Sequence, residues 1–184
     1  MNRYVIGALA LVGLTILLIL ILAGGHRRVP APQVKSLPSY AYTNSEVSVV
    51  VAGPIVAPQN HNEARIVISK NSSVFTLYQG YDGDVIDSKI FNNTQNSYSN
   101  FLYALYYAGF GKSINTTIPN NKGLCSTGNR YDFYLKNNGQ TVGHAWATDC
   151  TATPNSFGGN LGRTMSLFEA QIPQINTYTQ NANL

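Results

Sequence analysis

The longest apolar run of the chain extends from Tyr4 to Ala23 and contains no charged side chain. Twenty residues in an α-helix rise about 30 Å, which matches the hydrocarbon core of a bilayer. In that environment a single segment satisfies its backbone hydrogen bonds only as a helix. The pattern therefore predicts one transmembrane helix at residues 4–23, preceded by a short N-terminal tail at residues 1–3.

A cleaved signal peptide is the main alternative for this segment. The apolar region of a signal peptide normally has about 7–15 residues before a small-x-small cleavage site. The run here is longer, and Ala23-Gly24-Gly25 is only a passable cleavage site, so we favour an uncleaved signal-anchor. A pilin-like subunit is a further alternative, because Arg3 and Gly7 precede an apolar helix, but Val12 stands where pilins carry a glutamate.

The orientation of the predicted helix follows from composition rather than from flanking charge. Arg3 precedes the helix and Arg27 and Arg28 follow it, so the positive-inside rule gives almost a tie. The remainder of the chain is poor in Lys and Glu and rich in Asn, Thr, Ser and Tyr, which is typical of extracytoplasmic proteins. We expect a single-pass protein of the cell membrane that contacts the lipid bilayer through residues 4–23, with its N-terminus in the cytoplasm and its C-terminal part outside.

Beyond the membrane segment, the pattern changes twice. Residues 24–62 hold five of the eight prolines, which predicts an extended spacer in which Glu46–Val51 forms an edge strand at best. Residues 63–173 carry the periodic patterns of a folded domain. Residues 174–184 contain too little apolar content to pack, and we expect a flexible tail there.

Within the folded domain, alternating apolar positions predict strands at Arg65–Lys70, Val74–Gln79 and Val85–Phe91. A helix is predicted next, from a cap at Asn96 or Ser97 to Gly109. Its apolar stripe at helical spacing consists of Tyr98, Phe101, Leu102, Leu105 and Tyr106. A second, short helix is predicted at Arg163–Gln171, where Pro173 stops it.

The clearest hairpin joins Tyr131–Leu135 to Val142–Thr148 through a two-residue Asn138-Gly139 turn. That turn length pairs Leu135 with Val142, Phe133 with His144, and Tyr131 with Trp146, all on one face. No carboxylate then shares the face of His144, which is expected to be a half-buried structural histidine. Together these elements predict an α+β domain, a small antiparallel sheet with one or two helices packed on one face.

Composition excludes several classes of protein. Charged residues make up only 11% of the chain, and counting gives 20 asparagines beside the 12 tyrosines. After Arg28 there are nine basic and eight acidic side chains, so no basic stripe exists for phosphates and no nucleic-acid partner is expected. No motif indicates a cofactor or a metal site.

Tyrosines supply the one positive indication of function. Twelve tyrosines cannot all be buried with satisfied hydroxyls in so small a domain, and Tyr103, Tyr106 and Tyr107 share one predicted helix. Exposed tyrosine among Asn, Ser and Gly is the composition of adaptable recognition surfaces. We therefore predict surface binding at these three residues, with a cell-surface protein or a glycan as partner.

Cys125 and Cys150 bracket the hairpin. The expected register places them close enough for a disulfide, which suits an exported protein and would close a loop worth about 3–4 kcal/mol. The alternative makes Cys150 the nucleophile of a small extracytoplasmic cysteine enzyme. That reading lacks a base, because His144 lies six residues away on the same strand, roughly 20 Å along it.

The stretch from Tyr131 to Pro173 resembles a family of uncharacterised, single-span exported proteins of small-genome bacteria. The matching features are Tyr131 with Phe133, Trp146-x-Thr148-x-Cys150, Phe157-Gly158-Gly159, and Leu167-Phe168 leading to Gln171-Ile172-Pro173. This resemblance implies a location at the cell envelope and implies nothing about catalysis. The leading hypothesis from the sequence is a membrane-anchored extracytoplasmic domain that acts in binding, adhesion or envelope structure and has no complete catalytic set.

Overall fold

The computed structural model describes residues 36–184. The predicted N-terminal tail and transmembrane helix at residues 1–3 and 4–23 lie outside this part of the chain. Within residues 36–184, no helix has the length and apolar character needed to cross a membrane. The strands are β1 Ser45–Ala52, β2 Asn62–Ser69, β3 Ser72–Gln79, β4 Asp84–Asn92, β5 Arg130–Asn137 and β6 Gln140–Thr148. The helices are the 3-10 turns η1 Leu37–Tyr40 and η2 Pro58–Asn60, and the α-helices α2 Gln95–Ala108, α3 Leu161–Glu169 and α4 Ile175–Thr179.

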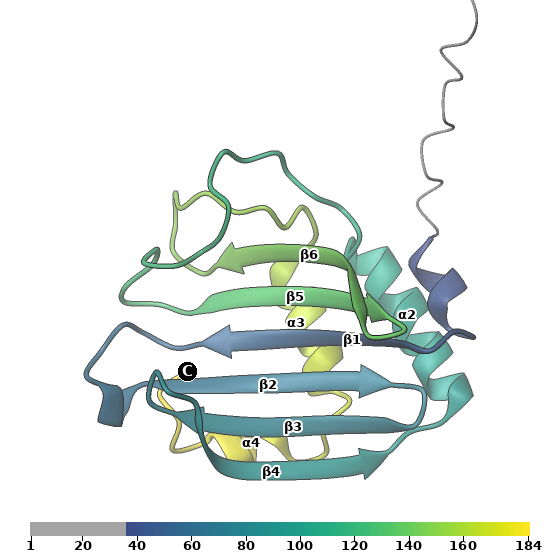
Figure 1. Cartoon of the computed structure of the whole chain (residues 1–184), viewed down its shortest axis with the longest axis horizontal. Helices are drawn as coiled ribbons and strands as arrows, with labels where there is room; N and C mark the ends of the chain where they lie inside the picture. The colour runs from purple at the N-terminus through teal and green to yellow at the C-terminus, as the bar shows by residue number, and fades with distance from the viewer. Residues whose placement is uncertain (1–35) are drawn as a thin grey trace, which may run out of the picture. The chain divides into compact units, whose positions relative to one another are not determined.

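All six strands form one antiparallel sheet in the order β4-β3-β2-β1-β5-β6. Strands β1 to β4 form a meander, and α2 then returns the chain to the other side of β1, where β5 and β6 are added. The three α-helices lie behind the sheet in Figure 1, and the opposite face is turned toward the viewer without a helix. The predicted α+β class, a small antiparallel sheet with helices on one face, is confirmed.

The predicted spacer at residues 24–62 is wrong for its second half. Residues 45–52 form β1, which pairs with β2 on one side and β5 on the other and is therefore central rather than at an edge. Val47 and Val49 are completely buried, and Val50 on the opposite face is only 9% exposed. The prolines do not interrupt this strand, since Pro38 lies in η1 and Pro54 and Pro58 follow β1.

The predicted flexible tail at residues 174–184 is also wrong. This segment contains α4 and packs against the core through Ile175, Tyr178, Ala182 and Leu184. These apolar residues are few, but their spacing places them on the side of the segment that faces the sheet. The folded unit is thus larger than the predicted 63–173 at both ends.

Helix α2 confirms the sequence pattern with small shifts. Its N-cap is Thr94, whose hydroxyl accepts from the backbone N–H of Ser97 at 3.1 Å, and its C-cap Gly109 has the left-handed φ of 87° that glycine tolerates. The buried stripe consists of Tyr98, Phe101, Leu102, Leu105 and Ala108. Tyr106 was expected in this stripe but is 49% exposed. Helix α3 begins at Leu161, two residues before the predicted start, because Asn160 caps it.

The β5–β6 hairpin has the predicted two-residue turn, but the predicted pairs are wrong. A β-bulge between Leu135 and Lys136 shifts the register by one residue beyond the turn. Phe133 therefore pairs with Ala145 and packs toward the helices, whereas His144 and Trp146 pair with Tyr134 and Asp132 on the opposite face. A one-residue shift moves every side chain beyond it to the other side of the sheet.

Candidate functional site

The outer surface of α2 is the first candidate site. Its buried stripe holds the helix on the sheet, which leaves Tyr103, Tyr106 and Tyr107 exposed by 51, 49 and 73%. Asn96 and Asn100 precede Tyr103 and Tyr107 on the same side, at spacings of four, three and four residues. The 14 residues of α2 include no charged side chain. The tyrosines predicted for binding thus lie together on a convex, uncharged helix surface, which we call the tyrosine face.

The aromatic rings of the tyrosine face are arranged for contact rather than for packing inside the domain. The rings of Tyr106 and Tyr107 meet edge to face, with centroids 5.6 Å apart. Within residues 36–184, the tyrosine hydroxyls that hydrogen-bond to other groups are those of Tyr98 with Ser45, Tyr81 with the backbone of Val56, and Tyr131 with the Asn129 side chain. The hydroxyls of the tyrosine face remain directed to solvent and can donate to, and accept from, a bound partner.

Cys125 and Cys150 form the predicted disulfide, with their Cα atoms 5.5 Å apart. The bond ties the loop before β5 to the end of β6. Asp149 lies beside it, and its Oδ1 accepts from the backbone N–H of Asn129 at 2.9 Å. A sulfur in a disulfide is not a thiolate. In this state Cys150 therefore cannot act as the nucleophile of an enzyme, and it lacks the charge with which a thiolate would hold a metal beside Asp149.

The face of the sheet without helices contains a histidine–carboxylate pair that the sequence analysis excluded. His144 Nε2 lies 2.9 Å from Oδ1 of Asp132, and Oδ2 of Asp132 accepts from the Asn121 side-chain amide at 2.8 Å. The ring of Tyr134 stacks on the imidazole, with centroids 4.6 Å apart. The bulge causes this arrangement, because its extra residue, Val142 of β6, brings His144 to the same face as Asp132. The expectation that no carboxylate shares the face of His144 is therefore wrong.

Burial changes the acid–base properties of two groups on this face. Desolvation raises the pKa of Glu63 above its ordinary value, against the opposing effect of the nearby Arg65 and His61. Desolvation also raises the pKa of Tyr134.

Asp132 orients the imidazole of His144, yet among residues 36–184 no hydrogen bond joins His144 to a serine, threonine or cysteine. The Asp132–His144 pair therefore holds the imidazole in place on the face of the sheet without helices, and it supplies no nucleophile there.

Neither models of known protein families nor curated proteins match the chain. No relative therefore assigns a role to the tyrosine face or to the Asp132–His144 pair.

Proposed function

We propose that this protein is a membrane-anchored extracytoplasmic binding domain that recognises another protein of the cell surface through the tyrosine face of α2. The proposal includes no catalytic step. The domain acts in adhesion or links components of the cell envelope to one another. Its anchor is the apolar segment at residues 4–23.

The observation that carries this proposal is that the solvent-exposed side of α2 has large aromatic side chains and no charged ones. Solvent-exposed helix faces usually carry Lys, Glu and Arg, because these residues favour both helix formation and solubility. Here the corresponding positions hold Tyr103, Tyr106 and Tyr107, which expose 49 to 73% of their surface. Tyrosine is enriched at binding hot spots, because it buries a large area at a small cost in conformational entropy.

The shape of the site favours a protein over a glycan. A helix face is convex, and a convex aromatic surface is matched by a groove in a partner, as in helix-in-groove recognition. Glycan sites on small domains are more often concave, so that several groups surround one sugar ring. The tyrosine face offers no such enclosure within α2, although its tyrosine and asparagine side chains suit either ligand chemically.

Two features support a location outside the cytoplasm. Structural disulfides persist in oxidising compartments and are rare in the cytosol, and both cysteines of the chain are joined in one. The apolar segment at residues 4–23 has the length of a membrane span. An anchored domain outside the membrane would present α2 to neighbouring surface proteins.

The proposal is tested by chemical crosslinking of the full-length protein in intact cells. We expect the wild-type protein to give discrete adducts with a protein partner. The Y103S/Y106S/Y107S variant should give at least tenfold less of these adducts, since the removal of hot-spot aromatics costs about 2 kcal/mol or more of binding free energy. Tyr42 provides a matched control, because it lies outside α2 and is 78% exposed. The Y42S variant should crosslink as the wild type does.

Two outcomes would contradict the proposal. Equal adduct yields from the triple variant and the wild type would exclude the tyrosine face as the binding site. Adducts that disappear after enzymatic removal of surface polysaccharide, and contain no second protein, would assign the site to a glycan instead.

A further inference from the structure

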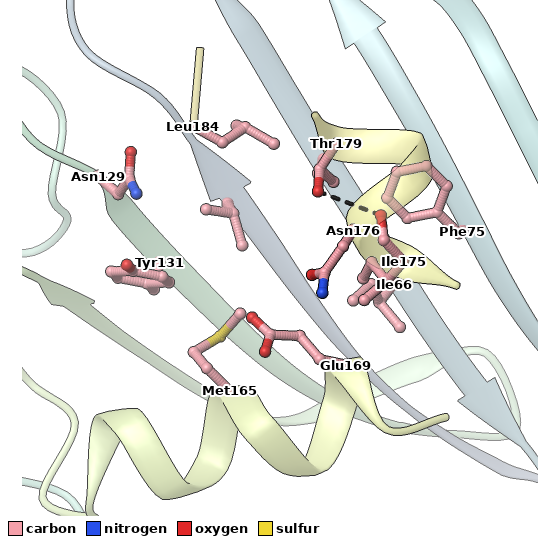
Figure 2. Close-up of a pocket in the computed structure, with 12 residues that line it drawn as sticks. Ile66, Phe75, Asn129, Tyr131, Met165, Glu169, Ile175, Asn176, Thr179 and Leu184 are labelled. Atoms are coloured by element: carbon pink, nitrogen blue, oxygen red, sulfur yellow. Dashed lines mark hydrogen bonds between the residues drawn. The ribbon is translucent and has the colours of Figure 1, made fainter. Parts of the chain in front are cut away.

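A cavity of about 250 Å³ lies between the helix-covered face of the sheet and helices α3 and α4 (Figure 2). Its floor is apolar and consists of Val51 from β1, Ala64 and Ile66 from β2, and Phe75 from β3. Met165 of α3 forms part of the opposite wall. Pockets for drug-sized ligands are larger, roughly 300–1,000 Å³, so this cavity fits a smaller molecule.

Two polar side chains, Glu169 and Asn176, lie near one another in this cavity (Figure 2). Glu169 projects from the end of α3 into the space between α3 and the strands, and Asn176 of α4 extends toward it (Figure 2). Asn129, which precedes β5, also lines the cavity but lies apart from these two side chains, beyond Tyr131 (Figure 2). Glu169 is the one charged side chain in the lining, and it takes part in none of the three ion pairs within residues 36–184.

We propose that this cavity binds a small organic cation, a primary ammonium attached to a short alkyl or arylalkyl body. The apolar body lies on the sheet floor beside Met165, and the ammonium group donates to the Glu169 carboxylate. An ammonium has three protons to donate, and the side-chain carbonyl oxygen of Asn176 is a further acceptor in the lining near Glu169 (Figure 2). The site is separate from the tyrosine face, so it does not depend on the function proposed above.

The segment from Ile175 to Leu184 forms the movable wall of the cavity. Helix α4 has no fully buried residue. The segment packs on the core through partly buried apolar side chains, and near its end the Asn183 N–H donates to Asn62 Oδ1 at 2.9 Å. The rings of Phe75 and Tyr178 add one stacked contact, with centroids 5.8 Å apart. The segment belongs to no strand, so its displacement opens a route for the ligand that leaves the central sheet intact.

The chain contains a built-in reporter for this site. Its two methionines are Met1 and Met165, and only Met165 lines the cavity. The full-length protein in nanodiscs, labelled with ¹³C at the methionine methyl groups, therefore gives two signals, which the M165L variant assigns. The probes are hexylammonium, 1-hexanol and hexanoate, which share one apolar body and differ in the charge of the head group.

We expect hexylammonium to shift the Met165 signal saturably, 1-hexanol to bind more weakly, and hexanoate to cause no shift. The E169Q variant should bind hexylammonium about tenfold more weakly, because a charge-assisted hydrogen bond becomes a neutral one. The A64L variant, which fills the cavity floor from a buried position, should abolish the shift. Its folded state is checked by the fluorescence of the buried Trp146.

Four results would overturn the inference. A Met165 shift that does not saturate, or that persists in folded A64L, would show that the probe does not enter the cavity. Binding of hexanoate as tightly as hexylammonium would exclude a cation site. Unchanged affinity of E169Q for hexylammonium would remove Glu169 from the site.

Discussion

Gly53 lies directly against the backbone of Asn183, so that a Cβ atom at residue 53 would overlap the carbonyl oxygen of Asn183. Gly53 follows β1, and its carbonyl oxygen also accepts from the guanidinium of the buried Arg130 at 2.7 Å. The absence of a side chain at residue 53 is therefore what allows the end of the chain to dock beside the central strand. This contact joins the two regions that the sequence analysis assigned to a spacer and a tail.

Replacement of Gly53 by alanine should release the segment from Ile175 to Leu184. The added methyl group forces the Asn183 backbone away, and overpacking of this kind costs about 1–3 kcal/mol. We expect faster amide hydrogen exchange across this segment and a lower free energy of unfolding. Gly111 is the matched control, because a Cβ there meets nothing within 4 Å and its φ is not left-handed. If the amide hydrogens of this segment exchange at the same rate in G53A and G111A, the contact between Gly53 and Asn183 does not hold the segment in place.

Removal of the disulfide should lower the stability of the folded domain substantially. Cys125 and Cys150 are separated by 25 positions, and the loop-entropy treatment gives about 3.5 kcal/mol for a loop of this length. The C125S/C150S variant should unfold at a correspondingly lower urea concentration, followed by the fluorescence of Trp146, the single tryptophan. Reduced wild-type protein should behave like the variant. A loss below about 1 kcal/mol in both would mean that the loop is already constrained without the bond.

Tyr98 should make the protein sensitive to alkaline pH. Burial raises the pKa of Tyr98 from 10 to about 12, against the hydrogen bond with Ser45, which lowers it. Between pH 10 and pH 12 the Tyr98 hydroxyl is deprotonated in the unfolded chain and protonated in the folded chain. The contribution of Tyr98 to the free energy of unfolding is therefore fully present below pH 10 and falls as pH rises toward 12. The difference of about two pKa units corresponds to about 2.7 kcal/mol.

The Y98F variant tests this effect in urea unfolding between pH 9 and 12. It should be less stable than the wild type at pH 9, by about 1 kcal/mol for the lost hydrogen bond to Ser45. Its stability should then decline less steeply as pH rises. Tyr42 is 78% exposed, so the Y42F variant should keep the slope of the wild type. A slope in Y98F as steep as in the wild type would assign the alkaline sensitivity to other groups.

Local patterns were sufficient for the elements whose signals are short in range. The buried stripe and Gly109 define α2, and Asn138-Gly139 defines the turn of the hairpin, because periodicity, caps and two-residue turns depend on neighbouring residues. The disulfide was predictable for the same reason, since Cys125 and Cys150 bracket that hairpin. The exposed positions of Tyr103, Tyr106 and Tyr107 also followed in part from the helix, although Tyr106 was assigned to the buried stripe.

The errors came from pairings between residues distant in sequence. The apolar run Val47–Val51 is typical of a strand buried on both faces, but the surrounding prolines led to an edge assignment. The bulge after Leu135 depends on how β5 pairs with β6 and has no local signal, so the contact between Asp132 and His144 was missed. The cavity at Glu169 arises where β1 to β3, β5 and the end of the chain come together, which no local pattern describes.

The most direct test of the central claim is photocrosslinking of the full-length protein in the membrane of intact cells, with benzoylphenylalanine at residue 107 or residue 90. Tyr107 is 73% exposed on α2, and Ile90 is 72% exposed on the edge strand β4, where no partner is proposed. We predict a discrete protein adduct from residue 107 alone, and digestion of that adduct by a protease added outside the cells. An adduct from residue 90 but not from residue 107, or an adduct protected from external protease until the membrane is broken, would contradict it.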